Sequence, residues 1–301
     1  MVRAPHLLLA IICVGSVLPG AAETSGIRIL TDVPYLEQGR TERLDLYLPA
    51  STTGTGQAVL WIHGGGWVSG DKAQAREKNI GQALAEWGCV VASVNYRMGD
   101  GAWPQNLLDC KNAVRFLRVH AAEYHLAPDR IAVAGGSAGG HLALMLAFTA
   151  GRQWEPAKPY PGVSNSVRAV LDFYGITNVL AWQKKDSAGR VTGQINQDAV
   201  RVIAGGEANN LAALRDASPV NQLSASSPPV LILHGLADTT VDHQQATELA
   251  AALQRVRVPH QILLLPGVGH TFNLDTWNQK PLPQDVRSPV REFLAKWLAA
   301  P

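Results

Sequence analysis

The sequence predicts a doubly wound α/β protein, with a mostly parallel sheet in a single domain. Short apolar runs alternate along the chain with longer segments in which apolar residues recur at helical spacing. Continuous apolar runs are typical of strands that are buried on both faces of a parallel sheet. The predicted strands are Ala58–Ile62, Val90–Val94, Ile131–Ala134, Ala169–Phe173, Val230–Leu233 and Ile262–Leu265. The predicted helices are Ala73–Trp87, Gln105–Tyr124, Ala138–Thr149, His243–Arg255 and Asp285–Ala299.

Two parts of the chain depart from this alternation. Near the N-terminus, Ile27–Val33 and Arg43–Leu48 alternate apolar and polar residues, which predicts antiparallel edge strands with one face in solvent. From Gly175 to Leu223 we find no strand-like run, only helix-like pieces at Ala199–Ile203 and Leu211–Arg215. Residues 175–223 are therefore expected to form a helical insertion. It could act as a lid or pocket wall, or consist of surface helices without a role at a site.

Composition excludes several classes of protein. The chain has 26 basic and 24 acidic residues, a net charge of +2, and no cluster of Lys and Arg, which argues against nucleic-acid binding. A hydrophobic content of 47% argues against disorder. Three cysteines without a CxxC pair predict neither a disulfide scaffold nor a zinc or redox site. No metal or cofactor is expected.

The first 22 residues have the pattern of a secretory signal peptide. Arg3 precedes an apolar run, Leu7–Leu18, and small residues follow it. The run is shorter than the ~20 residues of a membrane-spanning helix, so no stable membrane anchor is expected. We predict cleavage after Ala22, a mature domain of residues 23–301, and a secreted or periplasmic location. The alternative is a buried first helix, which the spacing does not favour.

Two cysteines remain after that cleavage. Cys89 opens an apolar strand and Cys110 lies within an apolar helix. They could pair in an oxidising compartment, but both positions also suit buried free thiols, which we favour.

A nucleophile motif follows the strand Ile131–Ala134. Gly135-Gly136-Ser137-Ala138-Gly139-Gly140 contains G-x-S-x-G and leads into a helix. Small residues are needed around Ser137 because the turn is strained, and the turn exposes the hydroxyl at the end of the sheet. The motif alone is weak, since a glycine-rich turn between a strand and a helix would look similar. The strand–turn–helix context is what favours a catalytic serine.

A glycine loop, His63-Gly64-Gly65-Gly66-Trp67, follows the strand Ala58–Ile62. Backbone N–H groups aimed at a carbonyl oxygen stabilise the negative charge that develops on it during acyl transfer. We predict Gly65, Gly66 and Ala138 as the oxyanion donors. A phosphate-binding loop is not favoured, since no Lys-Ser/Thr follows and the glycine spacing differs. His63 is expected to brace the loop.

Together these motifs resemble the α/β-hydrolase carboxylesterases of the hormone-sensitive-lipase-like group. HGGGW, GGSAGG and a late Asp and His carry the resemblance, which spans about residues 27–300. It is closer to the cap-less bacterial esterases, which include acetylxylan and feruloyl esterases, because residues 23–62 leave no room for an N-terminal helical cap. The resemblance also implies that Asn95-Tyr96-Arg97 and Asp109 are structural.

The acid and the base are expected after Ser137, in the order that this fold uses. Asp238 follows the strand Val230–Leu233, and His270 follows Ile262–Leu265. Both therefore lie past the carboxyl end of a strand, where ligands bind in open α/β sheets. Asp242 is a weaker candidate because it suits a helix cap, and Asp172 lies within an apolar strand. The predicted catalytic residues are Ser137, Asp238 and His270.

The substrate is predicted only as a class. Trp67, Trp103 and Trp277 could line the site and stack on an aromatic acyl group or a sugar, although ordinary packing is the alternative for each. The expected function is a secreted serine carboxylesterase acting on short-chain or aromatic acyl esters, including polysaccharide-linked esters. An arylformamidase-type amidase stays open. A serine peptidase with a propeller domain is not favoured, nor is a non-catalytic binding module, which normally lacks a triad residue.

Overall fold

A nine-stranded sheet runs through the residues described by the computed structural model, which are 21–24, 26–50, 55–152, 154–155, 158–185 and 191–300. The order of its strands is β1-β2-β3-β5-β4-β6-β7-β10-β11. The first three strands and β5 are antiparallel neighbours, and from β5 to β11 the strands are parallel. The strands are β1 (Ala21–Thr24), β2 (Ile27–Val33), β3 (Leu44–Leu48), β4 (Ala58–Ile62), β5 (Val90–Val94), β6 (Ile131–Gly136), β7 (Ala169–Phe173), β10 (Val230–Gly235) and β11 (His260–Leu265). The predicted doubly wound, mostly parallel α/β sheet is confirmed.

The register of the parallel strands brings the two glycine motifs together. Ile62 at the end of β4 pairs with Gly135 of β6, so HGGG and the serine turn leave the sheet side by side. On the other side of β6, β7 and β10 end at the same edge, where Phe173 pairs with Leu233. The carboxyl ends of these strands therefore form one platform for the site.

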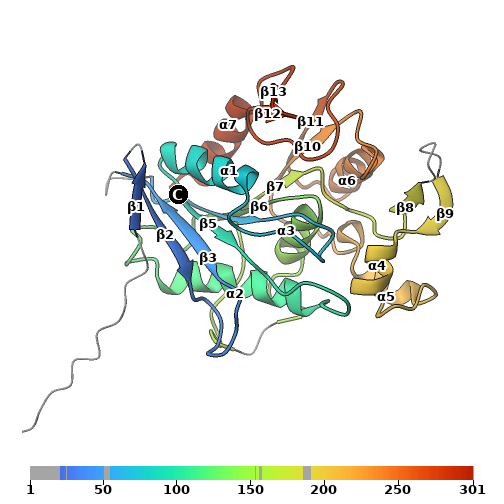
Figure 1. Cartoon of the computed structure of the whole chain (residues 1–301), viewed down its shortest axis with the longest axis horizontal. Coiled ribbons are helices and arrows are strands. Elements are labelled where there is room, and N and C mark those ends of the chain that lie inside the picture. The colour runs from blue at the N-terminus through green and yellow to red at the C-terminus, as the bar shows by residue number, and fades with distance from the viewer. Residues whose placement is uncertain are drawn as a thin grey trace, which may run out of the picture.

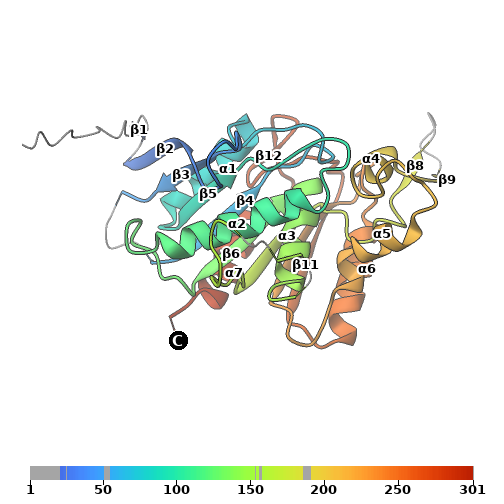
Figure 2. The same cartoon turned by 90° about the horizontal axis from the view of Figure 1, so that it is seen from below.

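Helices cover both faces of the sheet, as Figures 1 and 2 show. Side chains alternate between the two faces, so that in β4 Leu60 belongs to one apolar cluster and Trp61 to the other. The first cluster includes α2 (Gln105–Val119), α3 (Ala138–Phe148) and α6 (Gln244–Arg255). The second includes α1 (Ala75–Glu86) and α7 (Arg287–Trp297). The five predicted long helices are confirmed, although α2 ends at Val119 rather than Tyr124.

The prediction that Arg43–Leu48 is an edge strand with a solvent face is wrong. β3 lies between β2 and β5, and all of its residues are buried. Asp45 supplied the polar position in the alternation, but its carboxylate is buried and accepts from Lys72 Nζ at 2.8 Å. A paired buried charge therefore gave the same sequence pattern as a solvent-facing one.

The prediction that Ile262–Leu265 is buried on both faces is also wrong. β11 is the last strand of the sheet, paired only with β10, and Ile262 is 38% exposed. An edge strand lacks a neighbour on one side, and apolar composition alone does not reveal that position.

The insertion at residues 175–223 contains strands that the sequence did not predict. β8 (Gln183–Lys185) and β9 (Val191–Ile195) form a two-stranded antiparallel sheet. The helix-like pieces are present as α4 (Gln197–Val202) and α5 (Leu211–Asp216), followed by the 3-10 turn η1 (Pro219–Asn221). Figures 1 and 2 place α4, α5 and the β8–β9 hairpin together at one end of the molecule.

The N-terminal prediction falls largely outside the described residues, which begin at Ala21. The predicted cut after Ala22 lies within β1, which pairs with β2. No helix in the described ranges is both long and apolar enough to cross a membrane. Cys89 and Cys110 are buried free thiols, as favoured.

Candidate active site

Ser137 lies at a strained turn between β6 and α3. Its φ is 58° and its ψ is −122°, a backbone conformation that non-glycine residues rarely adopt. The Ser137 N–H donates to Phe173 O at 2.9 Å, which ties the turn to the end of β7. The residue as a whole is 8% exposed. Backbone strain at the serine is the conformation that the G-x-S-x-G pattern predicts.

The glycines around Ser137 are required by close packing. A Cβ on Gly139 would lie 2.1 Å from Ile62 O, and one on Gly135 would lie 2.4 Å from Gly139 O. A Cβ on Gly140 would meet Asp172 Oδ1 at 2.6 Å. The start of α3 can therefore approach β4 and β7 only because these positions have no side chain.

The three residues predicted from chain order lie in hydrogen-bond contact. His270 Nε2 is 2.9 Å from Ser137 Oγ, and His270 Nδ1 is 2.6 Å from Asp238 Oδ2. A carboxylate next to Nδ1 favours the tautomer in which Nδ1 carries the proton and Nε2 can accept one from serine. Tyr174 packs edge-on against the His270 ring, with their centroids 4.9 Å apart. The arrangement can therefore activate Ser137 as a nucleophile.

Both oxygens of the Asp238 carboxylate have hydrogen-bond partners. Its Oδ1 accepts from the N–H groups of Thr240 and Val241, at 2.8 and 2.9 Å. Its Oδ2 contacts His234 Nε2 at 3.2 Å as well as His270. Burial by itself would raise the pKa of Asp238. The hydrogen bonds from His234 and His270 outweigh burial and hold that pKa well below its usual range. Asp238 is thus a carboxylate at the pH where an imidazole base works.

Asp172, the competing acid, lies in β7 and is fully buried. Neither of its carboxylate oxygens has a hydrogen-bond partner among the described residues. Burial raises the pKa of Asp172 to about 7, against a smaller opposing effect of His234. The structure brings Asp238, rather than Asp172, into hydrogen-bond contact with His270.

The glycine loop after β4 lies directly beside Ser137. A Cβ on Gly64 would lie 3.2 Å from Ser137 Cβ. Gly65 and Gly66 have φ values of 110° and 61°, and Gly65 O accepts from Ser69 N at 3.0 Å to close the turn. Within the described part of the chain, the N–H groups of Gly65 and Gly66 donate to no acceptor. With Ala138 N at the start of α3, these groups are available to an oxyanion.

His63 braces the loop, as expected. Its ring stacks on Tyr96 with centroids 4.4 Å apart, and Nδ1 lies 2.7 Å from Gly64 O. The Tyr96 hydroxyl donates to His63 O at 3.0 Å. Burial lowers the pKa of His63, which keeps the ring neutral. Asn95 and Asp109 also make contacts that fit their expected structural roles. Asn95 Oδ1 accepts from Lys72 N, and Asp109 accepts from Arg40 and from Arg97 N.

The three predicted substrate-binding tryptophans occupy different environments. Trp67 is fully buried and packs edge-on against His141 and Trp182, so it does not line an open mouth. Trp103 is partly buried and contacts His141. Trp277, in β12 (Thr276–Trp277), donates from Nε1 to His270 O at 3.2 Å and so fixes the backbone of the base.

Three residues near the site were not assigned to it from the sequence. His234 contacts Asp238, Trp182 of the insertion packs on Trp67, and Asp198 of α4 reaches Gly66. His234 carried one local signal, its position at the end of the strand that precedes Asp238. Nothing in the sequence pattern signalled Trp182 or Asp198, because the fold of the insertion brings them to the glycine loop.

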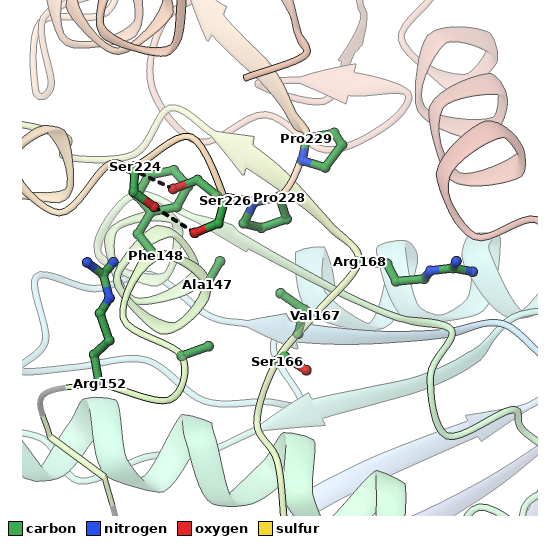
Figure 3. A pocket seen from close by; sticks show the side chains of 12 residues that line it. Ala147, Phe148, Arg152, Ser166, Val167, Arg168, Ser224, Ser226, Pro228 and Pro229 are labelled. Carbon is green, nitrogen blue, oxygen red and sulfur yellow. Dashed lines mark hydrogen bonds between the residues drawn. The ribbon is translucent and has the colours of Figure 1, made fainter. Parts of the chain in front are cut away.

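A separate cavity of about 430 Å³ lies at the opposite end of the parallel strands (Figure 3). Its lining comes from the segments that precede β7 and β10 and from the end of α3, including Ser166, Ser224 and Phe148. Ser224 and Ser226 hydrogen-bond each other at 2.9 Å, and Arg152 donates to Gln222 O. No histidine lines it, so its serines lack the base that Ser137 has.

Comparison with known proteins agrees with this fold. The BD-FAE family model matches residues 44–253. A probable carboxylic ester hydrolase of Mycobacterium tuberculosis, LipM, is 32% identical over 248 residues, which is 81% of this chain and 56% of that protein. The chain thus spans about half the length of the curated relatives that it matches.

Solved structures extend the comparison to most of the chain. A truncated carbohydrate esterase from gut microbiota has a TM-score of 0.76 at 23% identity, covering 93% of this chain and 99% of that one, which shows the fold alone. Thermogutta terrifontis esterase 2 with bound propionate has a TM-score of 0.69 at 26% identity, covering 89% and 97%.

The fold, together with a Ser–His–Asp arrangement beside a glycine loop, places this chain in the class of α/β hydrolases. Within that class, the chain belongs to the BD-FAE family.

Proposed function

We propose that this protein is a secreted serine carboxylesterase that hydrolyses short-chain or aromatic acyl esters, including esters linked to plant polysaccharides. The contact between Ser137 Oγ and His270 Nε2, 2.9 Å long and continued by Asp238, is the observation that carries the proposal. Secretion rests on the signal-peptide pattern of residues 1–22.

The first half of the reaction acylates Ser137. His270 Nε2 takes the hydroxyl proton as Ser137 Oγ attacks the ester carbonyl carbon, and Asp238 stabilises the imidazolium that forms. The carbonyl oxygen becomes an oxyanion that Gly65, Gly66 and Ala138 N–H groups stabilise, each contributing about 3 kcal/mol. The C–O bond to the alcohol then breaks. The alcohol leaves with the proton from His270, and the acyl group stays on Ser137.

The second half releases the acid. A water molecule gives a proton to His270 Nε2 and attacks the acyl carbon, which again places negative charge in the oxyanion site. The bond to Ser137 Oγ breaks and the serine regains its proton from His270. The products are one carboxylic acid and one alcohol for each ester and water consumed.

Two points support the substrate class. The propionate in the T. terrifontis structure is a short acid bound to a protein of the same fold. Export would bring the enzyme to extracellular polymers.

The test is an ester panel from C2 to C12 with acetylated xylan and methyl ferulate, applied to the wild type and to Ser137→Ala. We expect turnover of p-nitrophenyl acetate and other short esters that Ser137→Ala abolishes. Ser226→Ala, in the remote cavity, is the matched control and should retain activity. A Ser137→Ala rate near that of the wild type would overturn the proposal.

A covalent readout makes the test independent of substrate choice. Paraoxon should place one diethylphosphoryl group on Ser137, located by peptide mass spectrometry, and none on folded Ser137→Ala. Turnover of N-formylkynurenine well above that of p-nitrophenyl acetate would instead favour the arylformamidase-type amidase.

A further inference from the structure

Helix α4 of the insertion lies against the glycine loop. If Gly66 carried a Cβ, that atom would lie 2.8 Å from Asp198 Oδ2. Gly64, two residues earlier, lies beside the nucleophile. A Cβ added at Gly64 would lie 3.2 Å from Ser137 Cβ. A carboxylate from the insertion therefore lies next to Gly66, one of the residues of the predicted oxyanion site.

The backbone of α4 is fixed relative to the sheet. Gly101 N donates to Arg201 O at 3.1 Å, and Trp103 N donates to Val202 O at 3.3 Å, which joins α4 to the loop after β5. At the start of the helix, Asn196 Oδ1 caps Asp198 N at 2.9 Å. Because hydrogen bonds hold both ends of this short helix, the backbone from which the Asp198 side chain extends has a defined position.

The Asp198 carboxylate has unused accepting capacity. Its Oδ1 lies 3.6 Å from Arg201 Nη1, while Arg201 makes its shorter bonds to Asp100 Oδ1 at 2.9 and 2.6 Å. Its Oδ2 accepts no hydrogen bond from the residues that the structure describes. The side chain is 36% exposed, so a ligand can reach it.

We propose that Asp198 is a specificity-determining residue, whose Oδ2 accepts a hydrogen bond from a hydroxyl on the alcohol part of the ester. The ligand class is a partially esterified polyol or sugar, in which a free hydroxyl lies beside the ester bond. Oδ1 of this carboxylate lies near Arg201 Nη1, so Oδ2 is the oxygen left to accept from the hydroxyl. This inference rests on the proposed esterase function.

We assign the alcohol part of the ester to the side of Asp198 because side chains near the glycine loop differ in their exposure to solvent. Trp67 and Trp182 are buried, whereas the Asp198 side chain is 36% exposed. A polymer-linked alcohol must extend into solvent, while a small acyl group can be enclosed. The carboxylate therefore lies where an alcohol carrying further sugar units would leave the site.

The experiment compares two acetate esters whose alcohols differ only in hydroxyl groups, glyceryl monoacetate and propyl acetate. For Asp198→Asn we expect kcat/KM for glyceryl monoacetate, divided by that for propyl acetate, to fall roughly tenfold, mainly through KM, because a charge-assisted hydrogen bond is lost. Glu207→Gln, an exposed acid on the same insertion, should keep the wild-type ratio. Thermal unfolding checks that both variants are folded.

The outcomes separate the two proposals. If the wild type hydrolyses neither ester and paraoxon does not label Ser137, the proposed function fails. If the wild type is active but Asp198→Asn changes both esters equally, Asp198 only packs against the loop and this inference is overturned. Acetylcholine, assayed as a third acetate ester, tests cation binding: a loss confined to acetylcholine, with the glyceryl ratio unchanged, would overturn the proposal.

Discussion

His234 Nε2 lies 3.2 Å from Asp238 Oδ2, so the candidate acid contacts a second imidazole besides that of His270. The same nitrogen lies 3.0 Å from Val241 O. Since a carbonyl oxygen and a carboxylate both accept, Nε2 of His234 must carry the proton. His234 therefore donates to Asp238 and helps to position its carboxylate next to His270.

Replacing His234 should weaken the base without removing it. His234→Phe deletes the donor to Asp238 Oδ2, and we expect kcat for p-nitrophenyl acetate to fall about tenfold. The acid limb of its pH profile should move to higher pH, because a carboxylate with fewer donors has a higher pKa. His234→Gln, which keeps an N–H at a similar reach, should recover part of kcat. An unchanged pH profile in His234→Phe would limit His234 to packing.

Asp238→Asn should inactivate a folded protein. The Asn oxygen can still accept from Thr240 and Val241, but its NH₂ group would face the donors of His234 and His270. His270 would then favour the tautomer that cannot take the Ser137 proton, and kcat should fall by roughly 10³–10⁴. Steady-state kinetics measure the loss. Asp242→Asn, which keeps the acceptor for Gln244 N, is the control and should retain nearly full activity.

Gly139→Ala should prevent stable folding. The added Cβ would lie 2.1 Å from Ile62 O, a backbone atom of β4 that cannot move without disturbing the sheet. We expect a loss of at least about 3 kcal/mol in the free energy of unfolding, measured by urea titration. At Gly151, with φ of 66° and no atom within 4 Å, Ala should cost only about 1–2 kcal/mol. Equal losses at the two positions would contradict the packing argument.

Stability should depend on pH through Asp172. Because burial raises its pKa to about 7 in the folded state, folding favours the protonated acid. The contribution is complete below the unfolded value of about 3.9 and is lost as pH rises through about 7. Asp172→Asn removes this dependence. From pH 5 to pH 8, the free energy of unfolding of Asp172→Asn should therefore rise by on the order of 3 kcal/mol relative to that of the wild type.

Urea unfolding at the two pH values measures that difference. Asp216→Asn, an exposed aspartate on α5, serves as the control, with no comparable gain expected. A constant difference between Asp172→Asn and the wild type would show that Asp172 does not titrate in this range.

The sequence predicted those parts of the site that depend on local rules. Ser137, Gly139 and His270 follow the ends of apolar strands, and Asp238 was selected by chain order together with its position past a strand end. Asp45 misled because a buried ion pair and a solvent-facing residue look alike in a pattern. Asp198 and Trp182 were missed because their position depends on how the insertion packs, which no short motif encodes.

The bonds between α4 and residues 101–103 have a consequence for engineering. Arg201 O and Val202 O are acceptors for the backbone of the loop after β5, and the same helix carries Asp198 to Gly66. If only the insertion were taken from a relative, it would therefore lack the loop after β5 to which its helix is hydrogen-bonded. Exchange of substrate preference between members of the family should require residues 99–103 and 175–223 to be moved as one cassette.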